Sequence, residues 1–170
     1  VMIIAEQRDG NLHNVALELV GKAKELATKR NTTVTALVVG DKVSHLAENL
    51  AHHGADKVII VEDDRLKHYM TEPYVKAIYD VIEEEKPEIV LFGATSIGRD
   101  LAPRVSARVH TGLTADCTGL DIDEETGNLL MTRPAFGGNI MATIICEDHR
   151  PQMSTVRPGV MQKIPEDKNL

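Results

Sequence analysis

Strand and helix patterns alternate through residues 1–109, and this alternation restricts the fold more than any other feature of the chain. Short runs rich in β-branched residues are each followed by a segment with apolar residues at three- and four-residue steps, typical of an amphipathic helix. Successive strands in such a chain are parallel, because a helix carries the chain back across the sheet. We therefore expect an α/β fold built on a doubly wound, mostly parallel sheet with helices on both faces.

Local signals place the individual elements of this first part. The expected strands are 1–5, 33–39, 57–61 and 88–92, and the expected helices are 43–51, 71–85, 99–109 and one that starts at Asn14. In the first helix, Val15, Leu19, Ala23 and Leu26 form the apolar stripe, and Asn14 is expected to act as its cap. Pro73 lies in the first turn of the helix 71–85, where proline is favoured.

After Thr111 the helical periods stop, and strand-like segments with short turns take over. These segments are 113–122, 129–133, 139–146 and 153–156, with an acidic turn at 123–128. Short turns join antiparallel strands. We expect an antiparallel β extension at the carboxyl-terminal end, either as an edge of the main sheet or as a small second sheet.

A glycine- and hydroxyl-rich turn, Gly93-Ala94-Thr95-Ser96, connects the strand 88–92 to the next helix. The free N–H groups of a helix start bind anions, and an arginine adds a planar pair of donors, so Thr95, Ser96 and Arg99 form a candidate anion site of vestigial character. In the alternative interpretation Ser96 only caps the helix and Arg99 pairs with a surface acid. Asp100 and Arg104 are spaced as a solvated i,i+4 pair.

Composition excludes several classes of function. The 170 residues carry a formal charge of -7, which argues against nucleic-acid binding, and no apolar run reaches the ~20 residues of a membrane span. Known hydrolase and P-loop motifs are absent from the sequence, so we expect no catalysis by this chain alone. A cytoplasmic location in a bacterium is expected, although a mitochondrial matrix protein without its presequence would read the same.

Cysteine and histidine residues give no sign of a metal site. Cys117 and Cys146 are expected to be buried thiols in a reducing compartment. The histidines do not cluster with acids at ligand spacing and are expected in turns or on the surface; those considered are His45, His52, His53, His68 and His110.

Three groups of motifs together resemble one protein family. The first is 93–104, the second is Thr111-Gly112-Leu113-Thr114-Ala115-Asp116-Cys117, and the third joins 132–142 to 150–159. In this order they are similar to the amino-terminal domain of an electron transfer flavoprotein alpha subunit. The opening 4–7 and the turn 54–58 also fit. The segments 133–139 and 150–153 resemble the electron-bifurcating branch of the family.

The resemblance implies an adenine nucleotide alpha hydrolase-like, Rossmann-like fold and an alpha/beta heterodimer that carries electrons through FAD. Its expected partners are the beta subunit and an acyl-CoA dehydrogenase or similar flavoenzyme. Residues 1–160 correspond to the amino-terminal domain, and 161–170 to a linker toward an FAD-binding domain that this sequence lacks. In the family that second domain holds most of the flavin, so FAD is expected in the intact complex and not on this chain alone.

Arg133 and the turn Gly137-Gly138-Asn139 form the preferred functional surface. Two glycines allow close approach of another chain or of a flavin on the beta subunit, and a cation beside a flavin favours its reduced, anionic form. A plain hairpin turn is the alternative. Arg150, Arg157 and Pro158 are expected at an interface or as an anchor of the linker.

Two functions of different classes follow. The first is a scaffold and partner-docking domain that supports FAD-mediated electron transfer between dehydrogenases and an acceptor. The alternative is a free-standing adenine-nucleotide-binding module that uses the turn at Thr95 and Ser96 for phosphate. Binding of AMP, ATP or FAD to the chain separates the two.

Overall fold

The computed structural model describes residues 1–135 and 140–169. Its helices are α1 (Asn14–Arg30), α2 (Leu46–His52), α3 (Thr71–Glu85) and α4 (Ser96–Arg108), with a 3-10 turn η1 (Asp64–Leu66). Its strands are β1 (Met2–Ile4), β2 (Gln7–Arg8), β3 (Asn11–Leu12), β4 (Thr35–Gly40), β5 (Lys57–Glu62), β6 (Ile89–Gly93), β7 (Leu113–Cys117), β8 (Gly119–Ile122), β9 (Leu129–Pro134), β10 (Met141–Ile144) and β11 (Gln152–Val156).

A six-stranded sheet in the order β5-β4-β1-β6-β11-β7 forms the body, and every neighbouring pair in it is parallel. From β1 the chain moves outward to β4 and β5 on one side, and later to β6 on the other. This reversal confirms the expected doubly wound, mostly parallel sheet. The point between β1 and β6 is where open α/β sheets commonly hold ligands.

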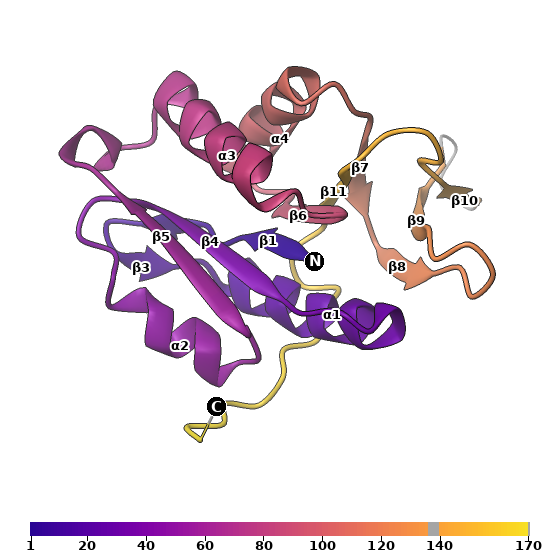
Figure 1. The fold of residues 1–170 in the computed structure, drawn as a ribbon, viewed down its shortest axis with the longest axis horizontal. Coiled ribbons are helices and arrows are strands. Elements are labelled where there is room, and N and C mark those ends of the chain that lie inside the picture. The colour runs from indigo at the N-terminus through magenta and orange to yellow at the C-terminus, as the bar shows by residue number, and fades with distance from the viewer. Residues whose placement is uncertain (136–139, 170) are drawn as a thin grey trace.

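Helices cover both faces of the body. As Figure 1 shows, α3 and α4 lie on one face of the sheet, and α1 and α2 lie on the other. Side chains along each strand alternate between the two layers, because successive residues of a strand point to opposite faces. In β1, for example, Ile3 packs into the α1 layer, whereas Met2 and Ile4 pack into the α3 and α4 layer. Each face therefore has its own apolar core.

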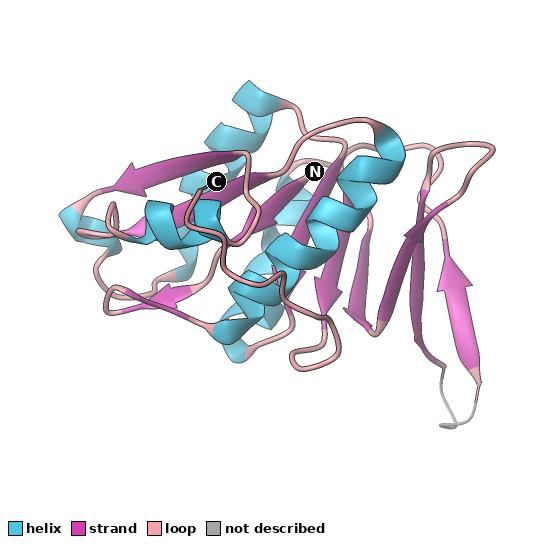
Figure 2. Ribbon diagram, turned by 90° about the horizontal axis from the view of Figure 1, so that it is seen from below, coloured by secondary structure: helices cyan, strands magenta, loops and turns pink. Residues whose placement is uncertain are grey.

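The antiparallel extension is a separate three-stranded sheet in the order β10-β9-β8, and Figure 2 shows it standing beside the end of the body. The expected single strand 113–122 is wrong: it divides at Thr118 into β7, which belongs to the parallel body, and β8, which belongs to the small sheet. Asp116 has a positive φ of 57° close to this division. Leu120 and Ile122 of β8 pack into the α1 layer, which joins the small sheet to the body.

The last strand departs from expectation most clearly. Residues 153–156 were expected among the antiparallel strands, but β11 runs parallel to β6 on one side and to β7 on the other. All five residues of β11 are buried. Three of them are polar, Gln152, Ser154 and Thr155, and this composition is typical of an edge strand rather than a central one. In the chain, the whole small sheet therefore lies between β7 and β11, two strands that pair with each other in the body.

Helix starts also differ from the sequence prediction by a few residues. Asn14 does not cap α1; the cap is His13, whose Nδ1 accepts a hydrogen bond of 3.0 Å from the Val15 N–H. The helix expected at 43–51 is α2, which begins at Leu46 and ends at His52. The strand expected at 139–146 is the shorter β10, and Cys146 lies in the loop after it, partly exposed.

The carboxyl-terminal segment follows the outside of α1 and α2. Gly159 N–H donates to the Glu18 carboxylate at 2.8 Å, and Asp167 N–H donates to the His52 carbonyl at 2.7 Å. A Cβ atom on Gly21 would lie 2.4 Å from the Gln162 carbonyl oxygen, so only glycine lets the segment cross α1 so closely. Within residues 1–135 and 140–169, no helix has the length and apolar character needed to cross a membrane.

Candidate functional site

The turn after β6 begins α4, and Thr95 is its cap. The Thr95 hydroxyl accepts a 3.0 Å hydrogen bond from the Gly98 N–H and donates to the Glu6 carboxylate. Ser96, expected as the cap, is the first residue of the helix and is exposed. A carboxylate of the chain itself therefore lies at the place where the sequence suggested a bound anion. Its negative charge opposes a second anion beside Thr95.

The two glycines of this turn have a packing role. A Cβ atom on Gly98 would lie 1.7 Å from the Gly93 carbonyl oxygen, and one on Gly93 would lie 2.7 Å from a methyl group of Val15. Both distances are far below van der Waals contact. These glycines let α4 and α1 approach β6 closely, so their presence needs no ligand to explain it.

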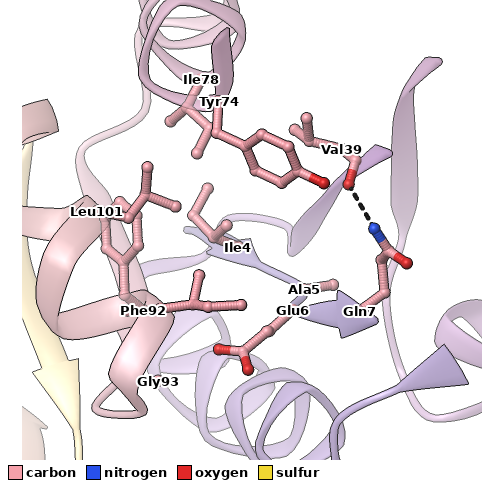
Figure 3. Close-up of a pocket in the computed structure, with 12 residues that line it drawn as sticks. Ile4, Ala5, Glu6, Gln7, Val39, Tyr74, Ile78, Phe92, Gly93 and Leu101 are labelled. Atoms are coloured by element: carbon pink, nitrogen blue, oxygen red, sulfur yellow. Dashed lines mark hydrogen bonds between the residues drawn. The ribbon is translucent and has the colours of Figure 1, made fainter. Parts of the chain in front are cut away.

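A small cavity lies at the carboxyl ends of β1, β4 and β6, at the point where the sheet reverses. Figure 3 shows Tyr74 of α3 and Phe92 of β6 reaching into it, with Gln7 at its rim, whose side-chain amide donates to the Val39 carbonyl at 3.0 Å. The cavity measures about 30 Å³. Ligand pockets usually measure about 300–1,000 Å³. An adenine nucleotide does not fit this space unless side chains move.

Arg99, Asp116, Arg133 and Arg157 come together at the carboxyl edge of the sheet, beyond this cavity. The Arg157 guanidinium makes two bonds with the Asp116 carboxylate, of 3.2 and 2.8 Å. This contact holds the pKa of Asp116 below its usual range, and the nearby charges of Arg99 and Arg133 act in the same direction. We refer to these four residues as the arginine cluster. The sequence placed Arg99 and Arg133 at two separate sites.

Arg99 and Arg133 differ in their own contacts. Arg99 is exposed, and its Nε donates to the Ala94 carbonyl at 3.1 Å, so the surface acid expected beside it is replaced by backbone. Arg133 is partly buried on β9, opposite Ala142 of β10. The remaining residues predicted with it, Gly137, Gly138 and Asn139, lie outside the described residues.

Asp100 takes part in more than the solvated pair predicted with Arg104. Its carboxylate is 3.7 Å from Arg104 and also accepts hydrogen bonds of 2.6 Å from the Thr71 and Tyr69 hydroxyls. These two bonds lower the pKa of Asp100. Burial of Tyr69, together with its bond to Asp100, raises the pKa of Tyr69 to about 12. The network joins the start of α3 to α4.

The hairpin of β9 and β10 presents apolar side chains to solvent. Ile140 is 67% exposed and Met141 is 53% exposed, and Ile144 and Ile145 are also exposed. β10 pairs only with β9 among the described strands, so its other edge has unpaired backbone groups. Exposed apolar strands at a sheet edge are a characteristic site of pairing with another chain. The sequence showed the strand but not which side of it would be covered.

Arg150 and Gln152 attach the small sheet to the body, and the sequence reading missed this role. Arg150 bonds to Glu88 Oε2 at 2.9 Å and to Asn128 Oδ1 at 2.7 Å. Buried Gln152 accepts a 2.7 Å bond from the Leu129 N–H at the start of β9. From α1, Arg30 donates to the Gly127 carbonyl. The base of the small sheet is therefore held at several points, while the hairpin at its far edge is open.

The remaining candidates bring no chemistry into the site. Cys117 is buried, which raises the pKa of its thiol and lowers its reactivity. Among the described residues, no three His, Cys, Asp or Glu side chains are arranged to hold a metal ion. The carboxyl edge of the sheet, with its arginine cluster, has the chemistry to bind an anionic group or to dock a partner.

Comparison with known proteins identifies relatives along the whole chain. A family model described as an electron transfer flavoprotein domain matches residues 1–169. The electron transfer flavoprotein subunit alpha of Clostridium acetobutylicum is 56% identical, over 100% of this chain and 51% of that protein. The acryloyl-CoA reductase electron transfer subunit beta of Anaerotignum propionicum is 48% identical, over 96% of this chain and 50% of that protein.

A third relative carries both NAD(+) and ferredoxin in its name. The lactate dehydrogenase (NAD(+),ferredoxin) subunit LctC of Acetobacterium woodii is 48% identical, over 92% of this chain and 37% of that protein. The chain spans about half the length, or less, of these three relatives.

Proposed function

Because the chain belongs to the electron transfer flavoprotein family, and is similar to the amino-terminal part of alpha subunits, we propose that it is the scaffold and partner-docking domain of such a subunit. In this role it holds a beta subunit and orients the domain that carries FAD. Electron transfer depends on the distance between redox centres, so a rigid support contributes to function by positioning.

The exposed hairpin of β9 and β10 carries this proposal. Its edge strand reads Met-Ala-Thr-Ile, without a charge, and is followed by Ile145. The edge strand β5, at one end of the six-stranded sheet, is different: Lys57 and Glu62 at its ends are exposed, and Lys57 pairs with Glu85 at 2.9 Å. Charged residues discourage pairing of an edge strand. Of these two edges, β10 is therefore the one suited to a partner, and we assign the beta subunit to it.

In this proposal FAD is bound by the intact complex and not by this chain alone. The small cavity beside β1 and β6 gives this chain no flavin pocket of its own at that point. Arg133, with Gly137, Gly138 and Asn139, is proposed to face a flavin on the beta subunit, where its charge favours the reduced form. Replacing Arg133 by Ala should lower the midpoint potential of that flavin in the heterodimer. An unchanged potential contradicts this role.

The names of the relatives support the class of electron partners. The acryloyl-CoA reductase and the NAD(+),ferredoxin lactate dehydrogenase both contain a subunit similar to this chain. We propose that the electron donor or acceptor is a flavin-dependent dehydrogenase of the acyl-CoA or a similar class. We also propose that the reaction is bifurcating and that the protein is cytoplasmic. Dehydrogenase turnover is measured with and without the heterodimer, with ferredoxin as a second acceptor. This assay tests the dehydrogenase partner and the bifurcating reaction. Activity that is independent of the heterodimer contradicts them.

The docking role is tested by measuring heterodimer affinity for the variant Met141→Ser/Ile144→Ser. Loss of two apolar contacts at an interface centre should weaken association at least about tenfold, which corresponds to about 1.4 kcal/mol. Met70→Ser is the matched control, because Met70 is 61% exposed at the start of α3, in the helix layer rather than on the hairpin. Equal affinities of the wild type and the hairpin variant would exclude this surface as the docking site.

A further inference from the structure

Backbone hydrogen bonds across four neighbouring segments bring the arginine cluster together. Ala94, which holds the side chain of Arg99, donates its N–H to the Val156 carbonyl at 2.7 Å. The next residue, Arg157, donates its N–H to the Cys117 carbonyl at 2.9 Å, and Thr118 donates to the Thr132 carbonyl at 2.9 Å. Arg99, Arg157, Asp116 and Arg133 therefore follow one another along the carboxyl edge, although they are distant in sequence.

The charges of this cluster do not balance. The cluster contains three guanidinium groups and one carboxylate, that of Asp116, which gives it a formal charge of +2 in a chain whose net charge is -7. Within residues 1–135 and 140–169, Arg157 pairs with Asp116, and neither Arg99 nor Arg133 makes an ion pair. Arginines that stay close together without a counter-charge repel one another, unless an outside anion joins them.

Two observations favour an acidic protein surface over a free phosphate as that anion. First, several backbone N–H groups at this edge already have acceptors inside the chain: those of Ala94, Gly98, Asp116, Arg157 and Thr118. A phosphate is usually cradled by such groups when they are free. Second, the site is open, with the side chains of Arg157 and Asp116 44% and 40% exposed.

The cluster is also continuous with the proposed docking hairpin. Arg133 lies on β9 directly opposite Ala142, the residue next to Met141. A chain seated on the apolar strand β10 would thus meet the arginines at the same edge of the molecule. Its contacting segment should combine apolar residues with acidic ones.

We propose that Arg99 and Arg157, the two exposed arginines of the cluster, receive a pair of Asp or Glu side chains from the subunit that docks on β10. Asp116 acts as the internal counter-ion that holds Arg157 in place until the partner's carboxylates arrive. This inference rests on the proposed function. Acidic segments are repelled by the rest of this chain and steered to this edge, which speeds productive encounter.

Association kinetics of the heterodimer at several salt concentrations test the proposal. In Arg99→Gln/Arg157→Gln, the association rate constant at low salt should fall about tenfold and its dependence on salt should flatten. The charge-matched control is Arg65→Gln/Lys76→Gln, which removes two exposed cations that pair with Asp63 and Asp80 near the β5 side of α3. This control should leave the association rate close to the wild-type value, because the two cations lie away from the cluster.

Asp116→Asn gives an expectation of opposite sign. Asparagine tolerates the positive φ of this position, so the fold should persist. Without the internal counter-ion the cluster attracts the partner's acids more strongly, and association at low salt should become at least about twofold faster. If the three cluster substitutions change only the unfolding of the isolated chain and leave association unchanged, the cluster is an internal ion network and the proposal is overturned.

The remaining outcomes are also decisive. Inorganic pyrophosphate that binds the wild-type chain and not Arg99→Gln/Arg157→Gln, with association unchanged in the variant, assigns the cluster to a small phosphate ligand and overturns the proposal. The hairpin variant of Met141 and Ile144 separates this failure from that of the proposed function. If only the hairpin variant weakens association, the acidic partner segment is overturned and the docking role stands. If neither variant has an effect, both proposals are overturned.

Discussion

The parallel body and the small antiparallel sheet differ in how far their apolar side chains are buried. Strands β1, β6 and β11 are buried along their whole length, because helices cover both faces of the body. In β10, three of the four residues are exposed. The body thus completes its apolar contacts within the chain, whereas the small sheet leaves some open. We infer that stability is concentrated in the first region and association in the second.

The largest expected effect comes from the body. Phe92 is 1% exposed and packs in the core between the sheet and the α3 and α4 layer. Phe92→Ala should lower the free energy of unfolding by about 3–5 kcal/mol, because it removes a large buried side chain and leaves a cavity. Urea denaturation followed by circular dichroism measures this. A loss below 1 kcal/mol would break the comparison, since the body would then not be the stable region.

A smaller effect is expected where the two regions join. Arg150→Ala removes the exposed hydrogen bonds to Glu88 and Asn128 and should cost about 1 kcal/mol. Hydrogen exchange should become faster in β8 and β9 while β1 and β4 keep their protection. Arg65→Ala, which breaks an exposed ion pair elsewhere, is the control. Uniformly faster exchange over the body would mean that the small sheet is not an independent unit.

The smallest effect on stability is expected in the hairpin. Met141→Ser/Ile144→Ser changes exposed side chains, and the free energy of unfolding of the isolated chain should stay within about 0.5 kcal/mol of the wild type. Thermal and urea unfolding of the isolated chain measure it. A large loss of stability would show that these residues pack against the chain itself, and the contrast between the two regions would then disappear.

The body was predictable because its signals are local. The stripe of Val15, Leu19, Ala23 and Leu26 predicted α1, and all four side chains are buried in its core. The alternation of strands with such helices leaves few arrangements other than a parallel sheet, which the structure confirms. Capping was harder to predict: Thr95 and Ser96 are adjacent hydroxyl residues, and the choice depends on which of them faces the Gly98 N–H.

The carboxyl-terminal part was less predictable because tertiary contacts decide it. Gln152 and Thr155 are buried in β11, where they bond to the backbone of Leu129 and Asp116. From the sequence alone, such polar residues indicate an exposed strand. The arginine cluster depends on the same strand, since β11 sets Arg157 between Asp116 and the turn that holds Arg99. Without the order of the strands, those residues looked like unrelated surface charges.

The late position of β11 in the chain also bears on how the protein is made. Until residues 152–156 leave the ribosome, β6 lacks its neighbour on one side, and β7 lacks the strand with which it pairs in the body. The nascent chain must therefore keep a half-built sheet, with an apolar edge unpaired, while the whole of β7 to β10 is synthesised. Translation pauses or premature stops in this stretch should yield products that aggregate or are degraded, and only completion of the last strand releases a native domain.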